Sequence, residues 1–441
     1  MSNNIFIETY GCQMNVADSE IVATVLQKNK FNMVFKPEEA DIILINTCSI
    51  RDNAEQKIFK RLQELNSLRT KNKKLKIGVI GCMAERVGEE FFEHSVEVNF
   101  IAGPDSYRNI AEIIYKSDTE RVSDILLSDT ETYEDILPKR TLTNSISAFV
   151  PVMRGCENFC SYCVVPYLRG KERSRTTDSV LKEIENHINN GIKEITLLGQ
   201  NVNSYHYNNT NFAKLLKEIA QKFPAPRLRY LTSHPKDLST ELLETIAKYD
   251  NISKSIHLPL QSGSNSVLER MNRKYTKETY KKLIDNICKI IPECTISTDI
   301  IAGFCGETEQ DHKETLELMK YAKYYYAFMF KYNERPGTTA AKNFKNDISD
   351  ELKTKRLNEI IDLQQQLSLN HNKQDIGKSY KVLIEGYSKR SNNFLMGRTS
   401  QNKVVVFPYD ELTDTKISAG DTVNVKIIDC TSATLKGVII A

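Results

Sequence analysis

Three cysteines stand close together in the middle of the chain, at Cys156, Cys160 and Cys163. Cysteine thiolates bind soft metals, so this C-x3-C-x2-C spacing predicts a metal centre. A structural zinc site needs four ligands, and no fourth Cys or His lies in the same stretch. A cubane iron–sulfur cluster held by three thiolates leaves one iron free to bind a substrate or a cofactor. The spacing therefore favours a 4Fe-4S cluster with an open iron over zinc.

The composition sets limits on where such a centre would work. The chain has 441 residues, enough for about three domains. Lys and Arg total 60 against 57 Asp and Glu, and the resulting net charge of +3 is too small to indicate nucleic-acid binding by itself. Ten cysteines without an export signal or an apolar membrane segment predict reduced thiols in a cytoplasmic protein, with no membrane contact. We expect a monomer by default.

The first part of the chain, residues 1–125, alternates apolar strands with helical patterns. This alternation predicts an α/β domain with a parallel, flavodoxin-like βαβ sheet. Helices are expected from about Val16 and from about Asn53. The three strand segments are residues 4–11, 40–47 and 75–81.

Three further cysteines, Cys12, Cys48 and Cys82, fall at the carboxyl ends of these three strands. Sites form at that edge of an open α/β sheet, so the three thiols could converge on one point. The plainer interpretation is three separate buried thiols, because free cysteine is among the most buried residue types. The residues alone leave both interpretations open.

Six further βα units follow an irregular, polar stretch at residues 126–145, which predicts an interdomain linker. The units occupy residues 146–373 and predict a partial (β/α)6 TIM-type barrel, with chemistry at the carboxyl ends of its strands. A long polar helix is expected over residues 350–372. The expected barrel strands are residues 147–155, 194–199, 228–233, 253–260, 295–303 and 326–332.

The last segment, residues 374–441, consists of β-rich stretches separated by turn residues, which predicts a small C-terminal β-barrel. Basic residues outnumber acidic ones there, and Lys389, Arg390, Arg398 and Lys403 lie near one another in sequence. A basic face of this kind suits RNA, and a solvated surface is an equal alternative.

A second basic stretch follows the central cysteines. It contains Arg169, Lys171, Arg173 and Arg175, with Tyr167 nearby. Basic residues beside an aromatic ring suit a flipped-out base and its phosphates, so these four are candidate RNA contacts. The alternative is a charged face of the helix expected from about Thr176.

Glycine and glutamine residues mark the ends of several barrel strands. Glycine permits close approach of the backbone to a ligand, so these positions are candidate cofactor contacts. They are Gly199, Gln200, Gln261, Gly263 and the stretch Gly303 to Gly306.

The central cysteine motif resembles the signature of the radical S-adenosylmethionine superfamily. The resemblance implies that the open iron chelates the amino and carboxylate groups of S-adenosylmethionine, whose reductive cleavage gives a 5′-deoxyadenosyl radical. It places Tyr162 against the adenine. The superfamily's usual Gly-Gly-Glu after the second strand is absent, and "LLGQNVNSY" stands there instead.

Motifs along almost the whole chain are similar to the methylthiotransferase family within that superfamily. The resemblance implies that Cys12, Cys48 and Cys82 hold a second, auxiliary 4Fe-4S cluster, and that the C-terminal barrel is an RNA-binding TRAM domain. It also implies two molecules of S-adenosylmethionine, one a methyl donor and one a radical source. Cys305 departs from the family, which more often has proline there. The motifs are "ETYGCQMN", "INTCSIRDNAEQK", "IGCMAER", "LLGQNVNSY", "RGCENFCSYCVVPYLRGKERSR", "HLPLQSGSNSVLERMNRKYT" and "STDIIAGFCGETEQD".

The stretch "RYLTSHPKDL" resembles the family members that methylthiolate N6-isopentenyladenosine beside the tRNA anticodon. Ser233 in this stretch joins the expected cofactor contacts, whereas the neighbouring His234 could equally be a core histidine. The implied partners are tRNA carrying N6-isopentenyladenosine, an electron donor and a sulfur or cluster donor. Related substrates, threonylcarbamoyl-adenosine in tRNA or an aspartate of a ribosomal protein, remain alternatives. A non-catalytic, metal-containing RNA-binding protein is the alternative of another class.

Overall fold

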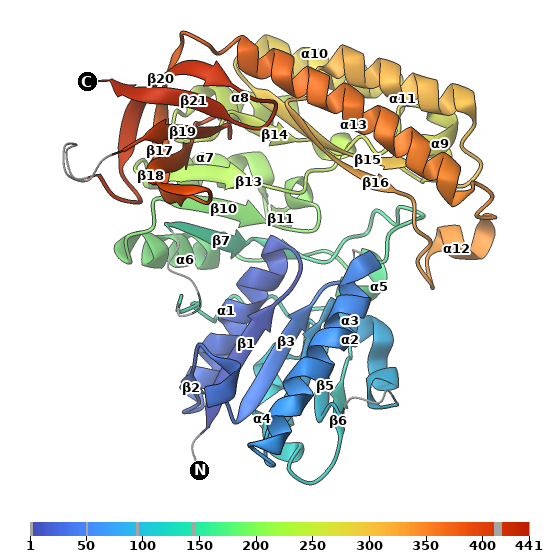
Figure 1. Cartoon of the computed structure of the whole chain (residues 1–441), viewed down its shortest axis with the longest axis vertical. Coiled ribbons are helices and arrows are strands. Elements are labelled where there is room, and N and C mark those ends of the chain that lie inside the picture. Colours follow the sequence, from blue (N-terminus) through green and yellow to red (C-terminus); the bar gives the residue numbers. More distant parts are fainter. Residues whose placement is uncertain are drawn as a thin grey trace.

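The structure is a computed structural model that describes residues 3–49, 52–93, 97–140, 142, 146–409 and 417–440. Figure 1 shows three parts in chain order: an N-terminal sheet domain in blue and cyan, a central half-barrel in green to orange, and a C-terminal barrel in red. The N-terminal domain lies on one side of the half-barrel, and the C-terminal barrel lies at its other end.

The N-terminal domain is built on a six-stranded parallel sheet of order β2-β1-β3-β4-β5-β6. Buried aliphatic residues form one core on each face of the sheet, which is typical of a doubly wound fold. The first five strands have the flavodoxin-like order, so the predicted domain type is confirmed. The elements are β1 (Asn4–Thr9), α1 (Gln13–Lys28), β2 (Asn32–Met33), β3 (Ile42–Thr47), α2 (Asp52–Asn66), β4 (Lys76–Gly81), α3 (Cys82–Val87), β5 (Phe100–Ala102), α4 (Ile110–Lys116) and β6 (Val122–Asp124).

The segment expected to be a linker has no helix or strand in its described residues, 126–140 and 142. It is nevertheless packed against the N-terminal domain, because Tyr133 and Ile136 are buried in one of the two sheet cores. Tyr133 donates a hydrogen bond from its hydroxyl to the carbonyl of Pro104, at 3.0 Å. The segment is therefore irregular but fixed in place.

The half-barrel has the six predicted strands, arranged as two three-stranded parallel sheets of order β13-β10-β7 and β14-β15-β16. A single parallel bridge between Leu228 and Ile252 connects the two sheets. The strand residues that face the surrounding helices are buried and aliphatic, and they form the largest core of the molecule. The strands are β7 (Ser147–Pro151), β10 (Glu194–Leu198), β13 (Arg227–Tyr230), β14 (Ser255–His257), β15 (Thr295–Ala302) and β16 (Tyr326–Lys331).

Amphipathic helices cover the outer face of the half-barrel. Six of the seven begin at a side chain that accepts a hydrogen bond from a backbone N–H of the first turn, namely Thr176, Asn211, Ser239, Thr276, Thr308 and Thr338. The helices are α6 (Thr177–Asn189), α7 (Phe212–Lys222), α8 (Thr240–Lys248), α9 (Asn265–Arg270), α10 (Lys277–Ile290), α11 (Glu309–Ala322) and α12 (Thr339–Asn343).

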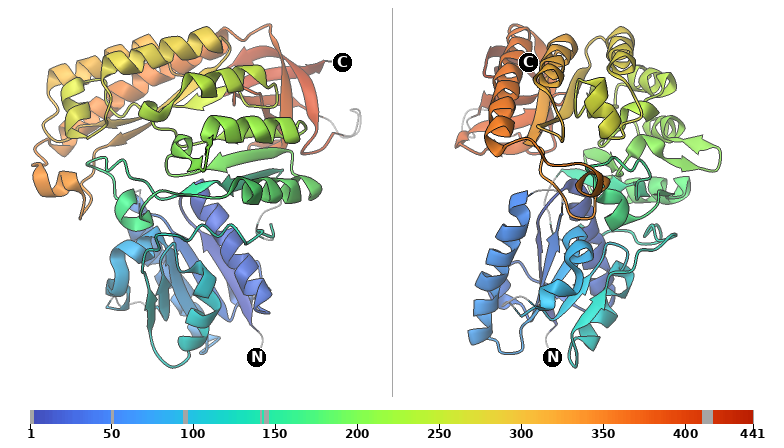
Figure 2. Two further views of the ribbon diagram at one scale, coloured as in Figure 1. Left: turned by 180° about the vertical axis from the view of Figure 1, so that it is seen from behind. Right: turned by 90° about the vertical axis from the view of Figure 1, so that its right-hand side faces the viewer.

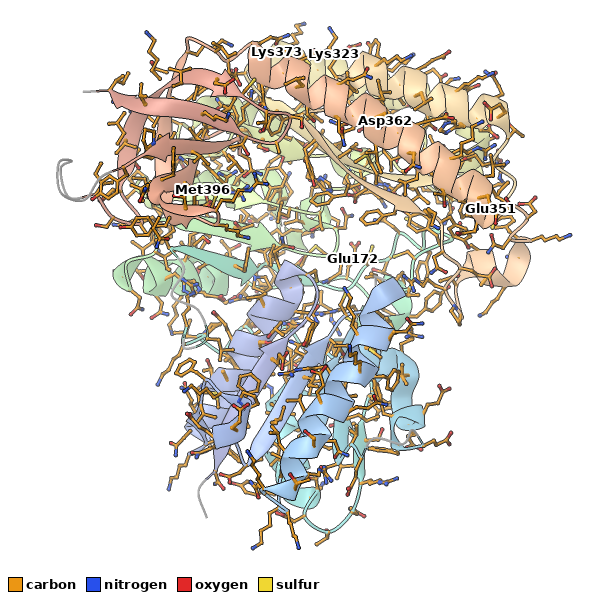
Figure 3. All side chains as sticks on the ribbon, in the orientation of Figure 1. Glu172, Lys323, Glu351, Asp362, Lys373 and Met396 are labelled. Atoms are coloured by element: carbon orange, nitrogen blue, oxygen red, sulfur yellow. The ribbon has the colours of Figure 1, made fainter. Side chains whose placement is uncertain are left out.

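The predicted long helix is α13 (Asp350–Lys373), which packs against β16. Glu351, Asp362 and Lys373 mark its course in Figure 3, from the end near α12 to the end near the C-terminal barrel. The helix therefore connects the half-barrel to the last domain.

The C-terminal domain is a closed barrel of order β17-β18-β19-β21-β20, as predicted. Its core is apolar and separate from the others. The loop after β18 lies against the starts of three half-barrel strands, where Arg227 donates to the carbonyl of Arg398 at 2.7 Å and Thr295 donates to that of Gln401 at 2.6 Å. The strands are β17 (Ser379–Ser388), β18 (Ser391–Arg398), β19 (Val404–Pro408), β20 (Thr422–Cys430) and β21 (Leu435–Ile440).

None of the helices in the described part of the chain is both long and apolar enough to cross a membrane.

Candidate functional site

The central cysteines lie in a loop between β8 (Met153–Arg154) and α5 (Val165–Arg169). Gly155 starts this loop with φ +79°, and a Cβ there would lie 1.8 Å from the carbonyl oxygen of Lys171. Its N–H donates to Oε1 of Gln200 at 2.6 Å, and the N–H of Cys156 donates to the carbonyl of Gly170 at 3.1 Å. Backbone contacts therefore fix where the three thiols lie.

Arg273 lies beside the same thiols and is buried. Its Nη1 donates to Sγ of Cys160 at 3.2 Å and to the hydroxyl of Tyr162 at 3.3 Å. Burial raises the pKa of Cys156 to about 11 and that of Cys163 to about 12. In the absence of a metal these two thiols hold their protons, and a metal would have to displace them.

The other three cysteines follow adjacent strands of the N-terminal sheet. Cys12 caps α1 after β1, Cys48 follows β3, and Cys82 begins α3 after β4. The space is so narrow that a Cβ on Gly11 would lie 2.5 Å from Cβ of Cys48. A hydrogen bond with Cys48, assisted by the charge of Arg169, lowers the pKa of Cys12 to about 6. The structure thus brings these thiols together beside the strand-order reversal between β1 and β3, where doubly wound sheets bind ligands.

No group of three His, Cys, Asp or Glu side chains in the described ranges meets closely enough to hold a single metal ion. Thiolates of one cluster bind separate iron atoms, so they need not converge on a single point. Both trios have the soft sulfur donors that iron–sulfur clusters use, and each offers three of them. The donor sets fit two clusters with an open iron each, and the ligand role of the six cysteines stays a prediction.

A buried charge network joins the two trios. Arg169 donates from Nε to Sγ of Cys82 at 3.2 Å, and its Nη2 lies 2.8 Å from Oδ2 of Asp18 on α1. Arg154, directly before the central loop, donates from Nη2 to the other oxygen of Asp18 at 2.6 Å. All three charged side chains are at most 3% exposed, so their charges are balanced inside the protein, while Nε and Nη1 of Arg154 and Nη1 of Arg169 have no hydrogen-bond partner among the described residues. One carboxylate of the N-terminal domain therefore binds two arginines of the half-barrel.

Apolar side chains seal the same junction. Cys82 packs with Val164 and Leu168, which follow the central trio in the chain. Met14 and Ala17 of α1 pack against the carboxyl ends of half-barrel strands in a second small core. Figures 1 and 2 show the N-terminal domain facing this end of the half-barrel, and Figure 3 marks Glu172 at the junction.

Three of the four arginine and lysine residues expected to bind RNA after the central trio do not form an exposed surface. Arg169, Arg173 and Arg175 are buried, and the last two pair with Asp105 at 2.8 Å and with Glu183 at 2.5 Å. The prediction of direct RNA contact is wrong for these three, because their charges are used inside the protein. Lys171 is exposed, with 68% of its side chain accessible, and stays a prediction.

The C-terminal basic residues divide in the same way. Lys403 is buried and paired with Asp375, so the prediction that it contacts RNA is also wrong. Arg398 is half-buried and donates to Glu385 at 2.9 Å. Lys389 and Arg390 are exposed at the turn between β17 and β18.

The polar residues expected to contact the cofactor line the strand ends near the central loop. Among the described residues, buried polar atoms without a hydrogen-bond partner include Oγ of Ser233, Nε2 of His234 and Oε1 of Gln261. Burial, with the nearby charges of Arg273 and Lys236, lowers the pKa of His234 to about 2, so its ring is neutral. Unpaired buried polar atoms are costly, and a polar ligand would satisfy them.

Two of the expected cofactor glycines have no room for a side chain. A Cβ on Gly199 would lie 2.5 Å from Cγ of Met153, and one on Gly303 would lie 2.4 Å from Cγ of Lys353. The close approach at the Cβ position is to the protein's own side chains, and contact of these two glycines with a cofactor stays a prediction. Gly263 is packed in the same way against Thr315.

Sequence reasoning missed Asp18, Arg154 and Arg273. Arg154 and Arg273 lie within two of the family motifs, and Asp18 lies three residues after the motif "ETYGCQMN". Asp18 is fully buried in the structure, but the polar residues Ser19 and Glu20 follow it, so the apolar pattern of α1 does not single it out. A charge in such a position predicts a partner.

Comparison with known proteins gives the class to which this arrangement belongs. Residues 4–103 match the family described as "Uncharacterized protein family UPF0004", residues 150–319 match the radical SAM superfamily, and residues 373–440 match the TRAM domain. The radical S-adenosylmethionine methyltransferase TsrM from Kitasatospora setae has a similar fold, with a TM-score of 0.59 at 13% identity over 77% of this chain and 75% of that one. The fold, the central trio and the superfamily match define a radical S-adenosylmethionine enzyme.

Curated relatives narrow the class. A tRNA-2-methylthio-N(6)-dimethylallyladenosine synthase of Bacteroides fragilis is 52% identical over 99% of this chain and 95% of its own length. Proteins of the same name from Bacteroides thetaiotaomicron and Flavobacterium johnsoniae are 51% and 46% identical over 99% of this chain, which covers 96% and 94% of their lengths. The chain belongs to the tRNA-2-methylthio-N(6)-dimethylallyladenosine synthase family. The predicted enzyme class, a radical S-adenosylmethionine tRNA methylthiotransferase, and the cofactor classes, S-adenosylmethionine and 4Fe-4S clusters, are those of this family.

Proposed function

We propose that the chain adds a methylthio group to C2 of N6-isopentenyladenosine beside the tRNA anticodon. Two 4Fe-4S clusters would take part, with S-adenosylmethionine as both methyl donor and radical source. The observation that supports this best is the junction itself: Arg169 follows one cysteine trio in the chain and donates to Cys82 of the other, at 3.2 Å. The proposed reaction needs a radical source and a sulfur source next to the same substrate. Two clusters held by neighbouring cysteine trios would provide both.

When bound, the clusters and S-adenosylmethionine supply the radical chemistry, the sulfur and the methyl group. Cys156, Cys160 and Cys163 would hold one cluster, and Cys12, Cys48 and Cys82 the other. The protein's own part is placement, because Arg273 orients Cys160 through the bond at 3.2 Å, and the turn at Gly155 sets the loop.

Exclusion of water is the second task of the protein. Reactive radicals need a site from which solvent is kept out. Val164 and Leu168 pack on Cys82, and Met14 and Ala17 cover the strand ends, so apolar side chains surround the space beside both trios. Ser233 and Gln261 offer buried oxygen atoms without a hydrogen-bond partner, which suit the polar groups of S-adenosylmethionine.

Contact with tRNA would come from the exposed basic residues. Lys389 and Arg390 lie at a turn of the C-terminal barrel, and Lys171 lies beside the central loop. Cations at these positions suit phosphate contacts, which position an RNA without reading its sequence. The proposal includes a monomer acting in the cytoplasm with an electron donor and a sulfur or cluster donor.

The substrate is tested by incubating the reconstituted enzyme with tRNA that carries or lacks the isopentenyl group, followed by mass spectrometry of the nucleosides. The proposal predicts a methylthio product only on the isopentenylated tRNA. Product on unmodified tRNA, on threonylcarbamoyl-adenosine or on a ribosomal protein would overturn the assignment. Binding of tRNA without consumption of S-adenosylmethionine would overturn the enzyme class.

The division of roles between the trios is tested separately. Replacing Cys12, Cys48 and Cys82 by Ala should abolish methylthio product and spare reductive cleavage of S-adenosylmethionine. Cys288→Ala is the matched control, because this thiol is exposed on α10, outside both trios. Loss of cleavage in the triple variant would contradict the division.

A further inference from the structure

Strand β16 lies at the edge of its sheet, and its two faces differ sharply. One face, with Ala327 and Met329, packs toward α13 and the main core. The opposite face presents Tyr326, Phe328 and Phe330, whose side chains alternate with the buried ones. That face is the inner face of the half-barrel, since the helices cover the outer one.

The three aromatic residues of this inner face are exposed by 48%, 44% and 44%, in the order Tyr326, Phe328 and Phe330. Large aromatic side chains usually bury most of their surface, and together these form a contiguous apolar stripe. The rings of Tyr326 and Phe328 are 5.0 Å apart, in an edge-to-face arrangement. We call Tyr326, Phe328 and Phe330 the aromatic stripe.

Polar groups border the stripe on the neighbouring strands. His257 of β14 lies 5.9 Å from the ring of Phe328, and its Nε2 is 3.4 Å from Oδ2 of Asp299 on β15. Asp299 is the register partner of Phe328. The side chain of Asp299 is 28% exposed, so an accessible carboxylate lies beside the aromatic stripe.

The stripe leads to the site of chemistry. Phe330 precedes Tyr332, which packs with Phe304 and with the partly buried Tyr162 of the central loop. Farther along the same segment, the N–H of Ala340 donates to the carbonyl of Ser161 at 2.7 Å. A group lying on the stripe would therefore be next to the cysteine loop at the end of β16.

We propose that the aromatic stripe, with Asp299, binds the flipped-out base of the substrate together with its prenyl side chain. Aromatic side chains stack on bases, and the branched apolar prenyl group suits the same surface. Asp299 accepts a hydrogen bond from the N6–H that N6-alkylated adenine retains, and its negative charge disfavours a phosphate at this place. The inference rests on the proposed function and specifies where the prenyl group is recognised.

The test measures the affinity of the reconstituted full-length enzyme for an anticodon stem-loop RNA, isopentenylated or unmodified, under anaerobic conditions. For the wild type we expect tighter binding of the isopentenylated RNA. Phe328→Ala should weaken binding of that RNA about tenfold, as expected for loss of one stacking partner. It should weaken binding of the unmodified RNA much less. Phe328→Tyr should restore most of the difference.

Tyr321→Ala is the matched control, because Tyr321 is an exposed aromatic on α11, 42% accessible, outside the stripe. It should leave both affinities unchanged. Iron content and S-adenosylmethionine cleavage without RNA show whether each variant is folded. If Phe328→Ala does not fold, Phe330→Leu is used in its place.

Equal weakening for both RNAs, or none for either, would overturn the stripe as the prenyl site. Equal affinity of the wild-type enzyme for the two RNAs would also overturn it. A stripe-dependent preference without any methylthio product would instead contradict the proposed function.

Discussion

At the scale of single residues, Asp18 connects the two halves of the site. It is fully buried, and it contacts Arg154 and Arg169, which come from either end of the central cysteine segment. Removing one partner from a buried ion pair leaves an uncompensated charge in a medium that solvates it poorly. Here, replacing Asp18 would leave two buried arginines, Arg154 and Arg169, without their carboxylate partner.

Asp18→Ala should therefore destabilise the protein by about 3–5 kcal/mol, the range for breaking a buried pair. Denaturant unfolding followed by the fluorescence of the tyrosines measures the change. Asp129→Ala is the matched control, because Asp129 pairs with Lys171 in the open, where the side chains are 75% and 68% exposed. That variant should change stability by less than about 1 kcal/mol. Similar losses in both variants would contradict a special role for the buried network.

Residue spacing alone identifies the central trio, because its three cysteines are local in sequence. The second trio needed the strand pattern and the family resemblance, since its members are more than thirty residues apart. The roles of Arg169, Arg173 and Arg175 could not be predicted, because a basic run has the same letters whether solvent, RNA or a buried carboxylate faces it. Only the packing of the two domains decides between these.

At the scale of elements, the turn at Gly155 determines the course of the cysteine loop. Its φ of +79° and the carbonyl of Lys171 both exclude a side chain. Gly337 shares the first constraint, with φ +84°, but has open space where a Cβ would go. Alanine substitutions at the two glycines therefore distinguish the cost of backbone strain, present at both, from the cost of a steric clash, present only at Gly155.

Gly337→Ala should cost about 1–2 kcal/mol, the penalty of a left-handed conformation for a residue with a Cβ. Gly155→Ala should cost clearly more and lower the iron content, because the loop must move away from Lys171. Thermal melting and iron analysis of the two variants provide the comparison. Normal iron content in Gly155→Ala would contradict the fixed loop.

Helix α3 supplies a pH-dependent contribution through Glu85. Burial, together with the nearby charges of Asp105 and Asp124, raises the pKa of Glu85 from 4.5 to about 8. The folded protein keeps a proton that the unfolded chain releases above pH 4.5, so stability from this group falls as pH rises toward 8.

Glu85→Gln should remove that fall, and the variant should gain melting temperature relative to the wild type between pH 5 and pH 8. Glu89→Gln, at an exposed position of the adjacent 3-10 turn, should follow the wild type at every pH. A melting difference between Glu85→Gln and wild type that does not change with pH would contradict the raised pKa.

The sequence pattern identified the long elements and missed the short ones. The six half-barrel strands and the sheet strands β1, β3 and β4 lie in stretches with enough apolar residues to be recognised. Strands β2, β5 and β6 have two or three residues, too few for a period to show. Helix α1 begins at Gln13, three residues before the expected Val16, and Cys12 at its N-cap position makes no side-chain capping hydrogen bond.

At the scale of the whole molecule, the two outer domains occupy opposite ends of the half-barrel. The N-terminal domain covers the carboxyl ends of the strands, where the cysteine loop lies. The C-terminal barrel closes the amino ends, where Arg227, Ser253 and Thr295 donate to carbonyls of the loop after β18. The C-terminal TRAM domain is therefore also attached to the half-barrel by direct hydrogen bonds.

Arg227→Met should weaken the contact between the half-barrel and the C-terminal barrel. The Arg227 guanidinium donates to the carbonyls of Arg398 and Thr399, at 2.7 and 3.1 Å. We expect a loss of about 1–3 kcal/mol, the cost of leaving buried polar groups unpaired. Limited proteolysis should then release the C-terminal barrel faster. Arg390→Met, at the exposed turn between β17 and β18, serves as control and should not. Unchanged proteolysis of Arg227→Met would indicate that the two domains are merely tethered.

The central claim is that two cysteine trios hold two clusters on the two sides of one junction. Iron counting after anaerobic reconstitution tests it most directly. Two cubane clusters require ~8 Fe per wild-type chain, and replacing either trio by Ala should leave ~4. A wild-type value of ~4 that one triple variant abolishes and the other leaves unchanged would contradict the claim.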